Sequence, residues 1–304
     1  VPVTLKMKVS NLVRISSLLI ASCVMLAPTL LTAQEKVKVV ASFSILGDMV
    51  RQVTGDLAEV TTIVGPDADA HVYTPNTADA KSVAHAEIIF VNGLGFETWS
   101  QTLIETSNTK AEVFVATNGI TPLMVDGQID PHAWNSLKNG MQYVANIADA
   151  MAKTDTINAE AYKGNARKYM ARLEKLHKQA LERHAKLKAD QCVVVTSHDA
   201  FGYLEADYGL TFLAPIGIDT DAEPSARDLA KLIDHLKSVG AGALFVENIT
   251  NPSLIQQIAR ETGIQVGGRL FSDALSERGG PATSYEEMFK HNLQTLITAL
   301  SPKL

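Results

Sequence analysis

The stretch Thr154–Lys188, TDTINAEAYKGNARKYMARLEKLHKQALERHAKLK, separates two similar halves of the sequence. It contains no proline, few β-branched residues and many Ala, Leu, Lys, Arg and Glu, which favour helix. Its larger apolar side chains fall near one stripe of such a helix: Tyr162, Tyr169, Leu173, Leu176, Ala180 and Leu187. We therefore predict one long helix in the middle of the chain.

On both sides of this stretch, short apolar runs alternate with helical patterns. The runs before it are VKVVASF (37–43), AEVTTIVG (58–65), EIIFVNG (87–93) and AEVFVAT (111–117). The runs after it are CVVVTS (192–197), TFLAPIG (211–217), ALFVEN (243–248) and IQVGGRL (264–270). Nearly continuous apolar strands separated by helices are typical of βαβ units. We predict an α/β fold with two lobes, each a parallel sheet flanked by helices, joined by one long rigid α-helix.

The N-terminal segment is typical of an export signal. Lys6, Lys8 and Arg14 precede and flank the apolar run ISSLLIASCVMLAPTLLTA (15–33), which ends in small residues. We expect a signal peptide over residues 1–33, cleaved after Ala33. The alternative is a lipid on Cys23, since IASC (20–23) resembles a lipoprotein box, although apolar residues continue past that cysteine. The remaining chain divides into an N-terminal lobe (34–153), a linking helix (154–189) and a C-terminal lobe (190–304).

Charge and cysteine content exclude some classes of function. The formal net charge is −6, and the expected signal peptide carries three cations and no acid, so the mature chain is more acidic still. Without a basic stripe to neutralise phosphates, nucleic-acid binding is not expected. Cys192 would be the only cysteine left after cleavage, so no internal disulfide can form.

Three of the eight histidines lie between the expected elements. His71 is in GPDADAHVYTPN (65–76), His132 is in DPHAW (130–134), and His198 follows an apolar strand in VVVTSHDAF (193–201). Asp273 has a similar place in GGRLFSDALSE (267–277). Ligands bind at the carboxyl ends of parallel strands, and imidazoles with a carboxylate suit zinc and are acceptable to manganese or iron. A metal between the lobes is one interpretation, and solvated loop side chains are the other.

The remaining histidines are expected to have no role in metal binding. His85, His235 and His291 lie inside amphipathic patterns and are expected to be structural or solvated. His177 and His184, seven residues apart in the central helix, are expected on its solvated face. In DPHAW, Asp130 is expected to cap a helix whose first residue is Pro131.

The segments DADAHVYTPNTADAK, DPHAW, TSHDAF and FSDALS, in this order around one long helix, resemble those of the zinc- and manganese-binding solute-binding proteins of ABC transporters, the cluster A-I metal receptors. The resemblance covers essentially the whole mature chain. It implies that His71, His132, His198 and Asp273 are the metal ligands. It also implies a periplasmic, monomeric receptor that delivers its ion to a membrane permease, with a periplasmic metallochaperone as a further partner.

Departures from that family bear on the choice of metal. The segment TPLMVDGQIDPH lacks the His-rich acidic loop of many zinc-specific members, and one cysteine cannot form the disulfide of others. Manganese-preferring relatives often have glutamate where this chain has His198. Three nitrogens and one carboxylate favour zinc, with manganese as the alternative.

Two functions of other classes compete with transport. A secreted zinc metallohydrolase would keep one coordination position open for water, which a fourth ligand at Asp273 would close. Glu247, at the end of another strand, would then be a general base; in a receptor it would be a hydrogen-bond acceptor behind a ligand. The second rival is an exported adhesion module with a structural metal. We expect a receptor and no enzyme.

Overall fold

The structure is a computed structural model that describes residues 1–4, 35–187, 192–222, 224–239 and 241–301. The chain divides into two units, Val1–Glu35 and Lys36–Leu304, and the fold described below is that of the second unit. The expected cleavage site after Ala33 and the alternative lipid site Cys23 lie outside the described residues.

The first lobe is built on a four-stranded parallel sheet in the order β2-β1-β3-β4. Its strands are β1 (Val37–Phe43), β2 (Ala58–Val64), β3 (Ile88–Val91) and β4 (Glu112–Val115). Its helices are α1 (Ser44–Thr54), the 3₁₀ turn η1 (Gly55–Leu57), α2 (Thr77–His85) and α3 (Ser100–Thr106). The central strands β1 and β3 are largely buried, which explains their apolar sequence.

The second lobe repeats this arrangement with a parallel sheet in the order β10-β9-β7-β8. Its strands are β7 (Val193–Val195), β8 (Thr211–Leu213), β9 (Ala243–Glu247) and β10 (Val266–Leu270). Its helices are α6 (Gly202–Tyr208), α7 (Ala226–Val239), α8 (Ser253–Thr262) and α9 (Tyr285–Leu300). In both lobes the first strand lies between the second and the third, and the fourth lies beyond the third. The predicted α/β class with two parallel sheets is confirmed.

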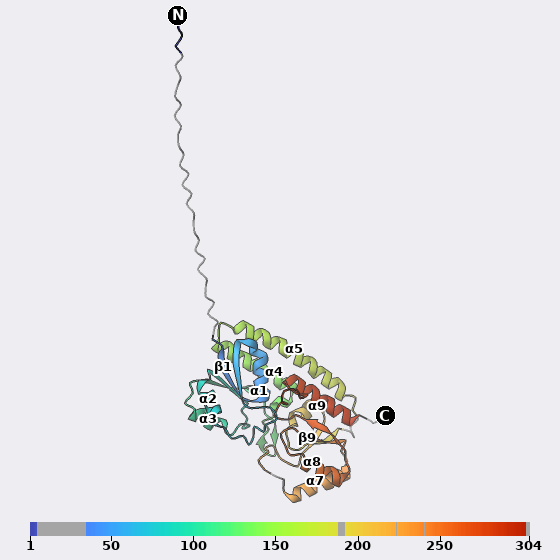
Figure 1. Ribbon diagram of the computed structural model, residues 1–304. Helices are drawn as coiled ribbons and strands as arrows, with labels where there is room; N and C mark the ends of the chain where they lie inside the picture. The colour runs from blue at the N-terminus through green and yellow to red at the C-terminus, as the bar shows by residue number, and fades with distance from the viewer. Residues whose placement is uncertain (5–34, 188–191, 223, 240, 302–304) are drawn as a thin grey trace. The chain divides into compact units, whose positions relative to one another are not determined.

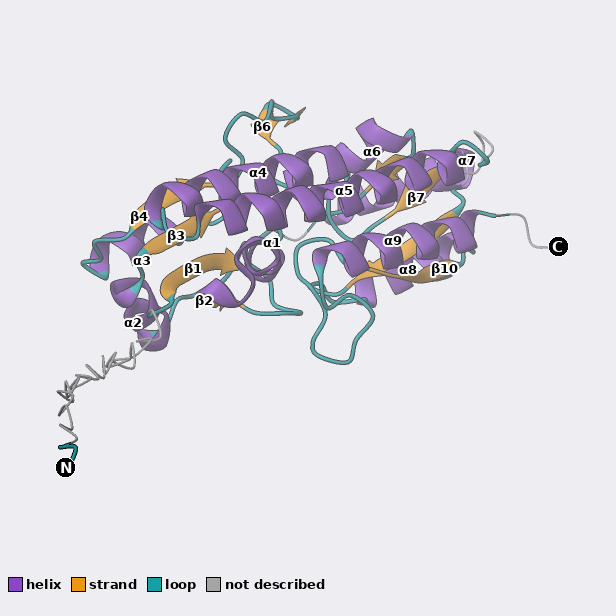
Figure 2. Cartoon of the chain, turned by 90° about the horizontal axis from the view of Figure 1, so that it is seen from above, coloured by secondary structure: helices purple, strands orange, loops and turns teal. Residues whose placement is uncertain are grey.

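The predicted long helix is also present, as α5 (Ala159–His184). It packs beside α4 (Leu137–Thr154) and contacts α1 in the first lobe and α6 and α9 in the second. Figures 1 and 2 show α5 running along both lobes. Its buried stripe faces the lobes and contains most of the apolar residues expected there.

The bounds of this helix differ from the expected Thr154–Lys188. Thr154 is the last residue of α4, and the chain turns at Asp155 before α5 begins. Asp155 stabilises the turn because its Oδ2 accepts hydrogen bonds from Asn158 Nδ2 at 2.7 Å and from the Tyr162 hydroxyl at 2.6 Å. The division of the chain into two lobes and a linking helix, with boundaries at residues 154 and 189, remains a prediction.

Buried hydrogen bonds join the two lobes beside the helices. Trp134 Nε1 donates to the Ser272 carbonyl at 2.7 Å, and the Tyr285 hydroxyl donates to the Trp134 carbonyl at 2.6 Å. The Tyr285 amide donates to Asp48 Oδ2 at 2.9 Å. The apolar core is continuous as well, since one buried cluster contains residues of both sheets and of α5. A smaller cluster lies beneath α7 and α8.

The segment DPHAW is not a helix start of the expected kind. His132 precedes a single 3₁₀ turn, η2 (Ala133–Asn135), and α4 begins only at Leu137. Ser136 caps α4, since its Oγ accepts from the Asn139 amide at 3.2 Å. The expectation that Asp130 caps this helix is wrong, because its carboxylate binds His132 instead.

A short hairpin in front of DPHAW was not expected from the sequence. β5 (Met124–Val125) pairs with β6 (Gln128–Ile129) in antiparallel fashion. Asp126 and Gly127 form the turn with φ values of 49° and 81°, a left-handed pair that Asp-Gly sequences favour. No helix in the described part of the chain is both long and apolar enough to span a membrane.

Candidate metal centre

Four side chains that are far apart in the sequence meet between the lobes. His71 lies in the loop between β2 and α2, and His132 lies directly before η2. His198 follows β7, and Asp273 follows β10. Each offers one ligand atom, and these atoms all lie within 4.8 Å of one another. The structure thus brings together all four residues that the resemblance implied.

The distances within this group are those of a small polar cage. His71 Nε2 lies 3.2 Å from His132 Nε2 and 3.3 Å from Asp273 Oδ2. Asp273 Oδ2 is also 3.0 Å from His198 Nε2, and Asp273 Oδ1 is 3.8 Å from His132 Nε2. Two ring-nitrogen lone pairs that face each other repel, so either one of these Nε2 atoms carries a proton and donates it to the other, or a cation lies between them. The Asp273 carboxylate beside them favours a cation at this position.

The cage is closed to solvent except at one of the four candidate ligands. His132, His198 and Asp273 have no exposed surface, whereas His71 is 8% exposed. Both oxygens of Asp273 and Nε2 of His198 lack hydrogen-bond partners among the described residues. Buried polar atoms without partners carry a large desolvation penalty, which a bound cation would remove.

The electrostatics of the group point in the same direction. Burial lowers the pKa of His198, but the charges of Glu247 and Asp273 outweigh burial and raise this pKa well above its ordinary value. Burial raises the pKa of Asp273, but His198 and His132 outweigh burial and hold it well below its ordinary value. Burial likewise opposes protonation of His71, while contact with Asp273 raises its pKa. A buried, ionised carboxylate thus creates a strong preference for cations.

A carboxylate lies behind each of the three rings. Asp130 Oδ1 accepts from both the backbone amide of His132 at 2.9 Å and its Nδ1 at 2.8 Å. Glu247 Oε1 accepts from the backbone amide of His198 at 2.9 Å. Glu247 Oε2 is 2.6 Å from His198 Nδ1, a charge contact without hydrogen-bond alignment. These contacts direct Nε2 of both rings inward, as outer carboxylates do for metal-bound histidines.

The carboxylate behind His71 differs from the other two. Asp219 Oδ1 lies 3.3 Å from His71 Nδ1, and its side chain is 57% exposed, whereas Asp130 and Glu247 are buried. Glu247 was expected as an acceptor because it ends a strand, whereas Asp219 is in a loop whose sequence has no chemical pattern. His71 is therefore the candidate ligand whose ring has the weakest support behind it.

Aromatic rings line the cage on the side of the first lobe. Phe96 packs edge-on against His71 with ring centroids 4.7 Å apart, and Trp134 packs against His132 at 5.3 Å. Phe96 and Trp134 also contact each other at 4.7 Å. They surround the candidate ligands with apolar surface, which lowers the local dielectric and strengthens charge interactions.

The other histidines lie outside this group. His177 and His184 were expected on a solvated helix face, and this is wrong: both are buried against Tyr208. His177 Nδ1 lies 2.9 Å from the Tyr208 hydroxyl. His235 is exposed, and His291 is partly exposed with Nε2 3.0 Å from the Arg269 carbonyl.

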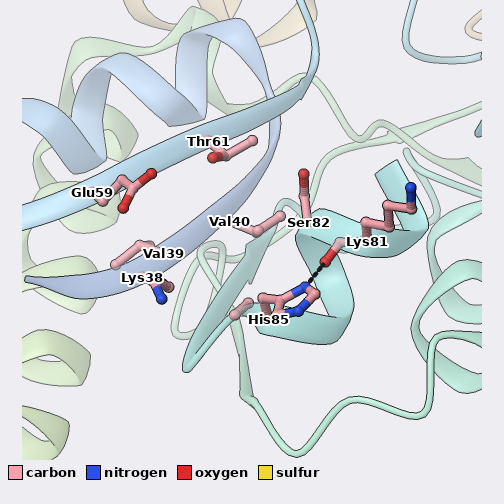
Figure 3. A pocket seen from close by; sticks show the side chains of 9 residues that line it. Lys38, Val39, Val40, Glu59, Thr61, Lys81, Ser82 and His85 are labelled. Atoms are coloured by element: carbon pink, nitrogen blue, oxygen red, sulfur yellow. Dashed lines mark hydrogen bonds between the residues drawn. The ribbon is translucent and has the colours of Figure 1, made fainter. Parts of the chain in front are cut away.

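His85 lines a separate pocket of about 330 Å³ at the first sheet, where Lys38 and Glu59 also lie (Figure 3). Its Nδ1 is 2.7 Å from the Lys81 carbonyl of its own helix, as Figure 3 shows. This contact is a local one within α2.

Comparison with known proteins gives one consistent result. The profile of the family described as "Zinc-uptake complex component A periplasmic" (ZnuA) matches residues 39–299. The manganese-binding lipoprotein MntA of Halalkalibacterium halodurans is 32% identical over 268 residues, covering 88% of this chain and 89% of that protein. The iron ABC transporter substrate-binding lipoprotein MtsA of Streptococcus pyogenes serotype M1 is also 32% identical, over 88% of this chain and 90% of the relative.

A solved structure agrees with these relatives. The periplasmic zinc-binding protein TroA from Treponema pallidum superposes with a TM-score of 0.84 at 26% identity, covering 88% of this chain and all of that one. The two-lobe fold, the group of three histidines and one aspartate, and the match over residues 39–299 agree: the chain belongs to the ZnuA family of periplasmic metal-binding components of uptake systems.

Proposed function

We propose that this protein captures a divalent transition metal between its lobes and delivers it to the permease of an ABC transporter. The observation that carries this proposal is the convergence of His71, His132, His198 and Asp273 in a buried site that reaches solvent only at His71. Relatives named as substrate-binding components of ABC transporters support the permease as partner. That the protein acts as a monomer, and that a periplasmic metallochaperone loads it, remain predictions.

Zinc is the metal that we propose, with manganese as the alternative. Three imidazole nitrogens and one carboxylate oxygen form a donor set of borderline softness, which suits tetrahedral zinc better than manganese. The names of the relatives do not decide the matter, because they include manganese, iron and zinc. Calorimetric titration of metal-free protein with zinc and manganese, followed by competition between the two, tests the choice. Tighter manganese binding would reverse it.

The alternative of a secreted zinc metallohydrolase has less support. Catalytic zinc has three protein ligands and keeps a position open for water, whereas a fourth ligand at Asp273 closes the site. The metal content of the purified Asp273→Ala variant distinguishes the two functions. A receptor loses affinity with this change, whereas an enzyme that uses Asp273 as a base keeps its zinc and loses turnover.

Export is part of the same proposal. Residues 1–33 have the order of a signal peptide, and relatives named as lipoproteins give weight to the alternative in which Cys23 carries a lipid. Mass spectrometry of the protein from its native envelope distinguishes the two. A free N-terminus at Gln34 supports cleavage after Ala33, and a diacylglyceryl group on Cys23 supports membrane anchoring.

A further inference from the structure

We propose that the loop segment of residues 65–69 is the gate through which the ion enters and leaves, and that Asp67 and Asp69 are positioning residues that hold this gate shut. This inference rests on the proposed function. It starts from the loop between β2 and α2, which has no regular secondary structure and carries His71, the ligand with solvent-exposed surface.

Two aspartates of this loop bind the opposite lobe. Asp69 Oδ2 accepts from the Thr220 hydroxyl at 2.6 Å, while its Oδ1 accepts from the His71 amide at 2.9 Å. Asp67 Oδ1 accepts from Asn248 Nδ2 at 2.9 Å, and Asp67 Oδ2 accepts from the Glu277 amide at 3.1 Å. We name the contacts of Asp69 with Thr220, and of Asp67 with Asn248 and Glu277, the latch. The latch reaches loops of the second lobe and includes no metal-binding atom.

The other sides of the cage are closed by buried contacts. The Tyr203 hydroxyl donates to the Asp130 carbonyl at 2.8 Å, and Asn135 Nδ2 donates to the Ala200 carbonyl at 2.9 Å. Trp134 closes a third side through Ser272. The latch contacts, in contrast, are exposed or only partly buried. Local opening follows the weakest and most exposed contacts, so the latch opens before the buried sides.

The loop is anchored to its own lobe at the end that follows the latch. Trp99 Nε1 donates to the Ala70 carbonyl at 2.8 Å, and the Tyr73 hydroxyl donates to Asp79 Oδ2 at 2.8 Å. Asn76 and Asp79 form a capping box at the start of α2. The segment that ends at Asp69, whose Asp67 amide also donates to the Leu275 carbonyl at 2.8 Å, is thus the part that moves when the latch opens, while Ala70 and the chain after it stay in place.

The backbone at Asp67 favours opening. Its φ of 51° is in the left-handed region, which is costly for residues other than glycine although aspartate tolerates it better than most. The contacts of Asp67 with the second lobe compensate for this conformation. When they break, the backbone is free to relax, and the loop gains entropy.

This gate makes a kinetic prediction that differs from that of a ligand. Since the latch uses no ligand atom, weakening it makes opening easier both with and without bound metal. Association and release rate constants should therefore rise together, and their ratio, the dissociation constant, should change little. Loss of a ligand acts differently, because it raises the dissociation constant mainly through faster release.

The test compares Asp67→Ala, Thr220→Val and the double variant with two matched controls. Thr283→Val removes a threonine–carboxylate hydrogen bond to Glu287 at the start of α9, and Asp56→Ala removes an exposed charge in η1. Stopped-flow mixing of metal-free protein with Zn²⁺, and of zinc-loaded protein with excess chelator, gives the two rate constants. For the double variant we expect both to rise about tenfold, which corresponds to about 1.4 kcal/mol.

Hydrogen exchange provides a second readout that needs no metal. Amides of the segment 65–69, and the Glu277 amide that Asp67 binds, should exchange faster in the double variant than in the controls. Rate constants and exchange equal to those of the parent would overturn the gate alone. A release rate constant and a dissociation constant that rise by the same factor would also overturn the gate. The loop would then stabilise a ligand and would not limit the rate at which the ion enters and leaves. A parent protein that binds neither zinc nor manganese would overturn the proposed function itself.

Discussion

His71 and Asp273 come from different lobes, and Nε2 of the first lies 3.3 Å from Oδ2 of the second. Neither lobe holds the four candidate ligands by itself, since His71 and His132 precede α5 and His198 and Asp273 follow it. The site therefore depends on how α5 and the buried interlobe contacts align the two sheets.

Replacement of His132 tests the ligand set most directly. His132→Ala removes a ring whose Nε2 faces the cage and whose Nδ1 is fixed by Asp130. We expect zinc affinity to fall by at least ~10–100-fold, because changes behind a zinc ligand already cost that much. Calorimetric titration measures the loss, and His235→Ala, on an exposed face of α7, is the control. Parental affinity in His132→Ala would exclude it as a ligand.

Glu247 offers a test of the support behind a ligand. Glu247→Gln keeps the size of the side chain but removes the charge 2.6 Å from His198 Nδ1. We expect zinc affinity to fall ~10–100-fold while one ion still binds per chain. Metal analysis after dialysis and competition with a chelator give both quantities. Loss of bound metal with loss of folded structure would instead assign Glu247 to the fold, so circular dichroism is recorded on the same samples.

The joined core predicts little movement between lobes. The contacts of Trp134 with Ser272 and Tyr285 are buried, and α5 packs on both lobes. We expect the radius of gyration of the mature protein to be unchanged on zinc addition, within the error of small-angle scattering. A large decrease would indicate closure of a hinge between the lobes and would contradict a rigid α5.

His184 predicts how the metal-free fold responds to acid. Burial lowers the pKa of His184 to about 4, below the 6.5 of a free histidine. His184 therefore takes up a proton below about pH 6.5 in the unfolded chain, but only below about pH 4 in the folded chain. The contribution of this group to the free energy of unfolding is fully present above pH 6.5. It decreases by about 3 kcal/mol as the pH falls through this window.

Denaturant unfolding of metal-free protein at several pH values measures this effect. In the parent, the ring centroids of His184 and Tyr208 are 5.3 Å apart. His184→Phe keeps a ring against Tyr208 and removes the titrating group. The variant should lose less stability between pH 6.5 and pH 4, whereas His235→Phe should follow the parent. An identical pH dependence in parent and His184→Phe would exclude His184 as a source of acid sensitivity.

The sequence predicted what depends on local patterns. Apolar runs identified all eight strands of the two sheets, and composition identified α5, because hydrophobic periodicity and helix propensity are properties of short segments. The prediction that His177 and His184 are solvated was wrong, because helical spacing shows which residues share a face but not what packs on that face. Tyr208, which covers them, lies in α6 of the second lobe.

The site was predicted in part for a similar reason. Positions after strands marked His71, His198 and Asp273, and the resemblance supplied their role as ligands. Asp130 was misassigned because an aspartate before a proline is an ordinary helix cap, and only the folded loop turns its carboxylate toward His132. The contact of Asp69 with Thr220 joins residues 151 positions apart, and neither carries a pattern that reveals the other.

The continuous core has a consequence for folding cooperativity. Buried side chains of the first sheet, such as Phe90, of α5, such as Leu173, and of the second lobe, such as Phe245, belong to one cluster. The lobes have separate sheets but share one core, so neither should unfold independently of the other. The chain from Lys36 onward should therefore unfold in one thermal transition. A substitution that creates a cavity beneath either sheet should then weaken the alignment of the candidate ligands that both lobes contribute, and lower the affinity for the proposed ion.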